Sequence, residues 1–389
     1  MRLLKKFFQH AVLICIIGYP IYKSLNYFQS LNPIEKELSD FKFSDIYFSY
    51  IDEKELDDDI FFVDIGVKDR RTTRVEISRF ITYLNKYIHP KVIAIDVNFT
   101  YDNTIPKSIN EELVSALSSD NIVMSYNLKN IQGQWLKDKS EIPIDYNIVK
   151  EGFSNNLVEK VEYGVERFFK PYVIIDEKKE QHFSLEVGKF LNKDVANSLF
   201  DIHDKVMINF AYRYNEIILI NDSNNYNLLK DKIVIVGLFT KDDNGRPLYN
   251  QDVHYTPSNP HYLGKSPPDM YGGEVIANII SNIKNDSFIR HYPELSKWIT
   301  IILSILVYII LLYFMGKSNN IFLVSSLVIQ FVLVAFFIFL SIFFIAKFNM
   351  YFDLTILAVI TFLSVEFIGV IDEIIDFIKN LIYRKPKES

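Results

Sequence analysis

The sequence predicts an α/β domain with a mostly parallel sheet built from βαβ units, together with four transmembrane α-helices. Three observations support this fold class. Three long apolar runs occupy the C-terminal quarter, a fourth follows the N-terminus, and the stretch between them alternates short apolar segments with segments of helical period. At 389 residues, of which 49% are hydrophobic and 23% charged, the chain is long enough for more than one domain.

The N-terminal segment, residues 1–29, is expected to be a membrane anchor. Three basic residues within the first six precede the almost wholly apolar stretch Phe7–Tyr22. A cleaved signal peptide is the alternative, but no small-x-small cleavage pattern follows the apolar stretch. Cys15 is the only cysteine, which excludes an intrachain disulfide and a cysteine-based zinc site.

Residues 30–295 are expected to form the α/β domain. Continuous apolar segments typical of buried parallel strands recur four times, and segments with apolar residues at helical spacing accompany them. This alternation implies right-handed crossovers and a parallel sheet covered on both faces. The expected strands are Phe61–Gly66, Lys91–Asp96, Asn121–Tyr126 and Lys232–Gly237, and the expected helices are Val75–Ile88, Glu111–Leu117, Phe183–Leu191 and Gly273–Ile283.

Other parts of this domain are less regular in sequence. Tyr172–Asp176, Met207–Phe210 and Glu216–Ile220 are weaker strand candidates. Asn127–Val158 shows no clean period, which predicts a loop or an insertion. The acidic run Asp52–Asp59 predicts a solvated connecting face.

Residues 296–371 are expected to hold three transmembrane helices joined by short connections. The apolar runs are Trp298–Met315, Ile321–Ala346 and Leu354–Ile371, and about 20 apolar residues suffice to cross the hydrocarbon core. Residues 372–389 are expected to follow as a short amphipathic tail.

The distribution of charge predicts the orientation in the membrane. Basic residues lie before the first span, at Lys317 between the second and third, and after the fourth, which places these segments in the cytoplasm. The domain of residues 30–295 is therefore expected to be extracytoplasmic. It contains 31 Lys and Arg against 42 Asp and Glu, a net charge of −11, whereas the flanking segments together carry +5. An acidic domain argues against a nucleic-acid-binding protein, which needs a basic surface.

Polar side chains follow the ends of the predicted strands, where ligands bind in open parallel sheets. Asp64 and Asp96 lie at the ends of the first two strands, and Asp252 and His254 lie in the loop after the fourth. Together they could form an oxygen-rich cation site or a polar ligand site. The alternative is that the acids brace loops by accepting backbone N–H bonds. Arg167 is a further candidate, either as a clamp on an anionic ligand or as the partner of a surplus acid.

The segments described so far, in this order, resemble the CHASE-two family of extracytoplasmic sensor domains from bacterial signalling receptors. The layout of one N-terminal span, a domain and three further spans is similar, and the resemblance runs from Phe7 to Ile371. The segments that carry it are Phe62–Asp64, Ala94–Phe99, Gly164–Arg167, Lys232–Gly237 followed by Asp252, His254, Thr256 and Pro257, and Met270–Asn278.

The resemblance implies a sensory input module in the bacterial inner membrane, whose stimulus acts outside the cytoplasm. Its output would be a cytoplasmic enzyme such as a nucleotide cyclase or a kinase. Only residues 372–389 follow the last span, too few for a catalytic domain. We therefore expect either a truncated receptor or a sensor that acts through a separate protein partner.

The tail offers a surface for such a partner. Apolar residues recur there at helical spacing, which predicts a face that docks a partner or forms a homodimer. An amphipathic helix resting on the membrane surface is the alternative. The residues of this face are Ile371, Ile374, Ile375, Ile378 and Leu381.

Two other classes of function stay open at this point. One is a membrane-anchored hydrolase that uses the same acids and His254, which would need a bound metal or a carboxylate of raised pKa facing a pocket. The other is a structural subunit of an envelope complex. The sequence lacks the P-loop, dinucleotide-binding, G-x-S-x-G and H-E-x-x-H motifs, so we favour a sensor without catalysis and assign no metal or cofactor.

Overall fold

The computed structural model describes residues 5–14, 16, 42–51, 54–131, 134–142, 149–155, 164–202, 205–242, 247–248, 252–259, 268–315 and 320–382. The chain divides into two compact units. Residues Phe48–Arg290 form the first, called the domain below. Met1–Tyr47 and His291–Ser389 form the second, called the helical unit.

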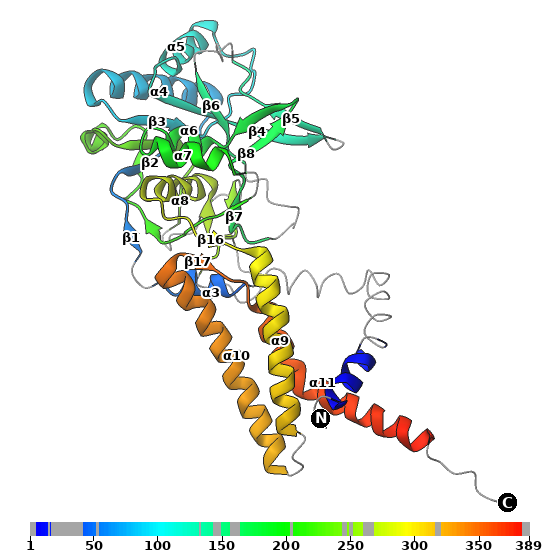
Figure 1. Ribbon diagram of the computed structural model, residues 1–389. Helices are drawn as coiled ribbons and strands as arrows, with labels where there is room; N and C mark the ends of the chain where they lie inside the picture. The colour runs from blue at the N-terminus through cyan, green and yellow to red at the C-terminus, as the bar shows by residue number, and fades with distance from the viewer. Residues whose placement is uncertain are drawn as a thin grey trace, which may run out of the picture. The chain divides into compact units, whose positions relative to one another are not determined.

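The domain is built on a seven-stranded sheet (Figure 1). Its strands lie in the order β12-β2-β13-β3-β4-β5, and β6 also pairs with β4. Every pair is parallel except β4 with β5. The strands are β2 (Ile60–Asp64), β3 (Val92–Ile95), β4 (Ile122–Ile131), β5 (Gln134–Asp138), β6 (Lys150–Phe153), β12 (Ile218–Leu219) and β13 (Ile233–Gly237).

Helices cover both faces of the sheet. Successive side chains of a strand point to opposite faces, so neighbouring residues of one strand enter different cores. Val63 and Ile95 belong to the core under α4 (Arg70–Tyr83) and α5 (Lys107–Leu117). Their neighbours Phe62 and Ala94 belong to the core under α6 (Phe183–Gly188) and α8 (Gly272–Asn285). Burial on both faces explains why these strands appear in the sequence as continuous apolar runs.

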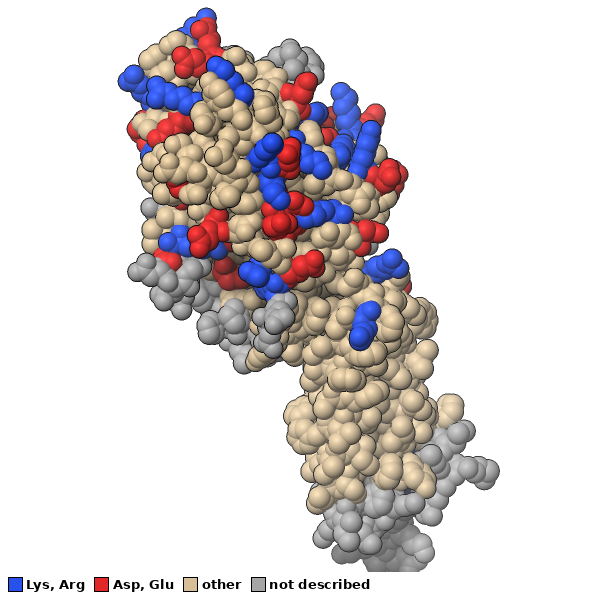
Figure 2. Space-filling model, turned by 90° about the vertical axis from the view of Figure 1, so that its left-hand side faces the viewer, with Lys and Arg blue, Asp and Glu red and all other residues tan. Residues whose placement is uncertain are grey.

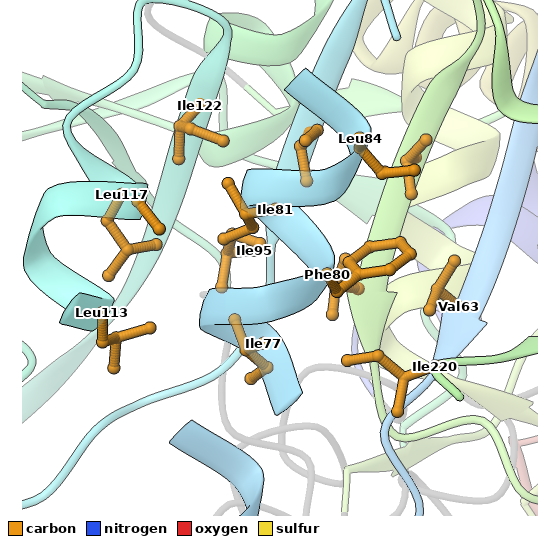
Figure 3. Packing of buried hydrophobic residues seen from close by; sticks show 14 of the residues in the cluster. Val63, Ile77, Phe80, Ile81, Leu84, Ile95, Leu113, Leu117, Ile122 and Ile220 are labelled. Carbon is orange, nitrogen blue, oxygen red and sulfur yellow. The ribbon is translucent and has the colours of Figure 1, made fainter. Parts of the chain in front are cut away.

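The core under α4 shows why this segment is a helix. Ile77, Phe80, Ile81 and Leu84 recur at helical spacing and are at most 2% exposed. Figure 3 shows them lying between the strands and Leu113 and Leu117 of the neighbouring helix α5. Asp69 begins α4 by accepting from the backbone N–H groups of Arg71 and Thr72 at 3.0 Å.

The predicted fold class is confirmed for the domain, which is mixed α/β with a parallel-rich sheet. The prediction of a loop or insertion over Asn127–Val158 is wrong in part. β4 continues to Ile131, and β5 and β6 extend the sheet. β5 lies at the edge of the sheet, and all five of its residues pair with β4 alone. Three of them are exposed and two are half-buried, so no buried face marks this strand in the sequence.

The acidic run is not a solvated face throughout. Asp57 is 3% exposed. Its carboxylate accepts from Lys284 Nζ and from Ser281 Oγ, each at 2.7 Å. Lys284 also contacts Asp59 at 2.7 Å, and the hydrogen bonds from Lys284 and Lys232 lower the pKa of Asp59 to about 2. The run is thus an anchor between the start of β2 and helix α8.

The helical unit contains α9 (Pro293–Met315), α10 (Asn320–Phe348) and α11 (Thr355–Ile382). Within the described residues, three helices are long and apolar enough to cross a membrane: Pro293–Phe314, Val324–Phe348 and Thr355–Leu381. Figure 2 shows charged side chains interspersed over the visible face of the domain, whereas these helices present almost none. Of the predicted first span, Phe7–Tyr22, the structure describes residues 7–14 and 16, which are helical, and the remainder lies outside the described residues. The predicted tail continues the last span as one helix, α11.

Candidate functional site

A small cavity lies beyond the carboxyl ends of β3 and β6, where ligands bind in parallel sheets. Its volume is about 60 Å³. Polar groups come from six separate segments, and α8 supplies an apolar wall. The lining residues are Asp96, Asn127, Ser154, Asn155, Glu166, His182, Asp252, His254, Gly272, Val275, Ile276 and Ile279.

Asp96 directly follows strand β3 and enters the cavity from the sheet. The hydroxyls of Ser125 and Ser154 donate to its carboxylate. Burial, first, and the neighbouring charge of Asp252, second, together raise the pKa of Asp96 from 3.8 to about 6, against the lowering effect of the two hydrogen bonds. Asp96 is therefore the acid of this cavity that exchanges a proton near neutral pH.

His254 connects two other acids across the cavity. Its Nδ1 lies 2.6 Å from Glu166 Oε1, and its Nε2 lies 3.2 Å from Asp252 Oδ1. Burial alone would lower the pKa of His254, but the hydrogen bonds to Asp252 and Glu166 outweigh it and raise the pKa to about 10. Both ring nitrogens then carry protons and both donate, so His254 is an imidazolium held between two carboxylates.

The start of α8 forms another wall of the cavity and requires a glycine there. The backbone carbonyl of Asp252 accepts from Gly272 N at 2.9 Å. A Cβ on Gly272 would lie 2.6 Å from Asp252 Oδ2, so any larger residue would displace this carboxylate. A Cβ on Gly273 would lie 3.9 Å from Asp96 Oδ2. Two carboxylates thus lie near the N-terminal end of a helix, where negative charge is favourable.

His182 lies in the cavity wall as a neutral residue. Its Nδ1 accepts from Ser184 N at 3.2 Å and caps α6. It is 1% exposed, and burial lowers its pKa to about 3. Because Nδ1 accepts, the proton is on Nε2, and the ring contributes no charge to the cavity.

Two of the sequence-predicted site residues lie outside this lining. Asp64 is 3% exposed and accepts from Gly66 N, Phe239 N and Thr240 Oγ1 at 2.7–3.0 Å. Its carboxylate joins the end of β2 to the loop after β13, the bracing role that the sequence left open. Arg167 is 7% exposed and is not among the lining residues.

The sequence reasoning missed Glu166, Ser154, Asn127 and Asn155. Glu166 lies beside Arg167 in the segment Gly164–Arg167, where the sequence indicates only the basic residue as a ligand-binding one. Asn127, Ser154 and Asn155 fall in the segment that showed no periodicity, so no strand end indicated them. Asn155 is fully engaged, since its amide accepts from Leu128 N at 2.8 Å and donates to Leu128 O at 2.9 Å.

The charges of the lining define what the cavity can bind. Three carboxylates face one imidazolium, and no lysine or arginine is among the lining residues. In the described part of the chain, the acid ligand atoms close enough to share a metal ion belong to Asp57, Asp58 and Asp59. Lys284 and Lys232 already neutralise that group. The cavity is thus acidic, small and suited to taking up positive charge.

The domain is α/β, with an acid-lined cavity at its strand ends, and the chain also has three helices long and apolar enough to cross a membrane. These features indicate a membrane protein with a binding or sensing domain. The CHASE2 domain family model matches residues 15–314, and the chain belongs to this family of sensor domains. No curated protein and no solved structure matches the chain.

Proposed function

We propose that the protein is an inner-membrane sensor whose input site is the cavity around Asp96 and His254 and whose output is a protein partner. The observation that carries the proposal is the clamp of His254 between Glu166 and Asp252, facing a carboxyl group of raised pKa. Residues 166 and 254 come from distant parts of the chain. A change of charge in the cavity therefore acts on two segments of the domain at once.

The size of the cavity limits the stimulus. A cavity of about 60 Å³ holds a few water molecules. Binding sites for metabolites are about 300–1,000 Å³. The size and the acidic lining of the cavity thus favour a proton or a small cation over a metabolite as the direct stimulus.

The membrane topology that we propose has four spans and an extracytoplasmic domain. Lys6 and His10 contact Asp372, near the end of α11. Lys42 contacts Asp353, just before α11 begins, at 2.7 Å. Lys6 and His10 thus lie beside a later part of this helix, whereas Lys42 lies beside its start. This supports an N-terminal anchor with Arg2, Lys5 and Lys6 in the cytoplasm.

The proposed output surface is the last part of α11. Ile371 and Ile375 are 5% and 8% exposed and pack within the helical unit, whereas Ile378 and Leu381 are 41% and 57% exposed. Ile374 is partly buried. The first part of the predicted docking face is therefore buried within the helical unit. Only its last part, Ile378 and Leu381, is available to a partner or a second copy.

The test is cross-linking and capture of the full-length protein from its own membranes. Wild type is compared with D96N/D252N, with I378E/L381E and with the surface control D201N, whose carboxylate is 84% exposed. We expect D201N to retain the cytoplasmic partner, I378E/L381E to lose it, and D96N/D252N to change its yield. Equal capture by all four proteins would contradict the proposal.

A membrane-anchored hydrolase is the second candidate, because Asp96 supplies the carboxyl group of raised pKa that this function requires. The small cavity volume favours the sensor, since it is well below the volumes of about 300–1,000 Å³ that are usual for sites binding metabolites. Turnover that D96N abolishes, with unchanged partner capture, would favour the hydrolase.

A further inference from the structure

A polar cluster lies within the helical unit, apart from the cavity of the domain. Asp372 of α11 accepts from Lys6 Nζ at 2.7 Å and from His10 Nε2 at 2.9 Å. His10 Nδ1 lies 2.8 Å from the hydroxyl of Tyr308 in α9. We call Lys6, His10, Tyr308 and Asp372 the Asp372 cluster.

The hydrogen bonds of this cluster form one continuous chain. When His10 is neutral and protonated on Nε2, it donates to Asp372 and accepts from Tyr308, while Lys6 donates to the second carboxylate oxygen. Lys6 and Asp372 then cancel each other's charge. His10 is 0% exposed, and ionisable groups between apolar helices are costly unless partners satisfy them. The cluster is therefore a specific attachment point.

The three segments that meet in the Asp372 cluster connect to different parts of the protein. The N-terminal segment leads into the domain at Phe48, and α9 begins directly after the domain ends at Arg290. α11 leads beyond the buried Ile375 to residues 376–381, which are exposed. The N-terminal segment and α9 are the two segments that connect to the domain along the chain. Through Asp372, both are joined to the helix that carries the proposed output surface.

We propose that the Asp372 cluster is the latch through which the two segments leading to the domain control the end of α11. This inference rests on the proposed sensor function. In the latched state, Lys6 and His10 hold Asp372 against α9. A displacement of either segment breaks hydrogen bonds to Asp372 and releases the last turns of α11, residues 373–382.

The test is hydrogen exchange with mass spectrometry on the full-length protein in lipid nanodiscs. D372N and H10Q are compared with E373Q, which removes the exposed carboxylate next to Asp372. We expect D372N and H10Q to accelerate exchange in both 5–14 and 373–382, on the order of tenfold, which corresponds to about 1.4 kcal/mol of local stability. E373Q is expected to leave both regions unchanged. Acceleration of only one region, or of neither, would overturn the latch.

A second arm tests the connection to the domain. D252N is expected to change exchange in 373–382 in an otherwise wild-type chain and to have no effect there when D372N is also present. If D252N alters exchange only within the domain, the sensor proposal fails while the attachment shown by D372N stands. If D252N acts on 373–382 equally with and without D372N, the signal travels by another route and the latch is refuted.

Discussion

Replacing Asp96 by asparagine is expected to stabilise the domain near neutral pH. Asparagine keeps the size of the side chain and an oxygen that accepts from Ser125 and Ser154, but it carries no charge. The pKa of Asp96 is raised in the folded domain, mainly because burial disfavours the ionised form and because Asp252 repels it. At neutral pH the wild-type domain therefore contains a carboxylate that the fold disfavours.

The magnitude follows from the two pKa values. The folded chain holds the proton up to about pH 6, and the unfolded chain releases it near 3.8. Between these values the folded state binds more protons, so wild-type stability falls as the pH rises. At about 1.4 kcal/mol per pKa unit the full loss is up to about 3 kcal/mol. D96N is expected to lack this loss and to exceed the wild type by the same amount above pH 7.

Tryptophan fluorescence can follow this difference in the full-length protein. The chain has two tryptophans, Trp135 in the domain and Trp298 in α9, so a W298F background leaves Trp135 to report on the domain. Unfolding is measured from pH 4 to 8 in detergent micelles for the wild type, D96N and the surface control D201N. The difference between the first two isolates Asp96 from other groups that titrate. Parallel pH profiles of D96N and the wild type would refute the reasoning.

Two further perturbations test the packing of the domain. K284M leaves Asp57 buried without its charged partner, and we expect a loss of about 3 kcal/mol in the free energy of unfolding, whereas K178M at an exposed lysine is expected to be neutral. In G152A the new Cβ would lie 2.6 Å from backbone atoms at the start of α6, so we expect a loss of about 3 kcal/mol or failure to fold. G369A, with nothing within 4 Å of its Cβ, is expected to unfold like the wild type.

The central strands can be predicted from the sequence because they are buried on both faces and are therefore apolar at almost every position. Ile60–Asp64 and Ile233–Gly237 are buried at all positions and therefore read as uninterrupted apolar runs. The order of the strands was not predictable in this way. β13 lies between β2 and β3, although it follows them by more than a hundred residues in the chain. Strand order depends on long-range packing, which no local pattern contains.

The site was predictable only to the level of residue type at strand ends. Asp64 and Asp96 end neighbouring strands in sequence and look equivalent. The loop after β13 supplies Phe239 N and Thr240 Oγ1 to Asp64 alone, which makes that carboxylate a brace. Glu166 reaches His254 across 88 residues of sequence, and only the fold brings the two together.

The arrangement of charges suggests how a proton would act on the domain. When Asp96 is protonated, the imidazolium of His254 faces two carboxylates, Glu166 and Asp252, and both are engaged by it. When Asp96 ionises, a third negative charge enters the same small cavity and repels Asp252.

Asp252 is the acid that can move in response, because its side chain is 62% exposed whereas that of Glu166 is 17% exposed. Its carbonyl is bound to Gly272 N at the first residue of α8, so movement of Asp252 acts directly on that helix. α8 ends at Asn285, and α9 begins at Pro293. Few residues thus separate the helix that would respond first from the first span that follows the domain.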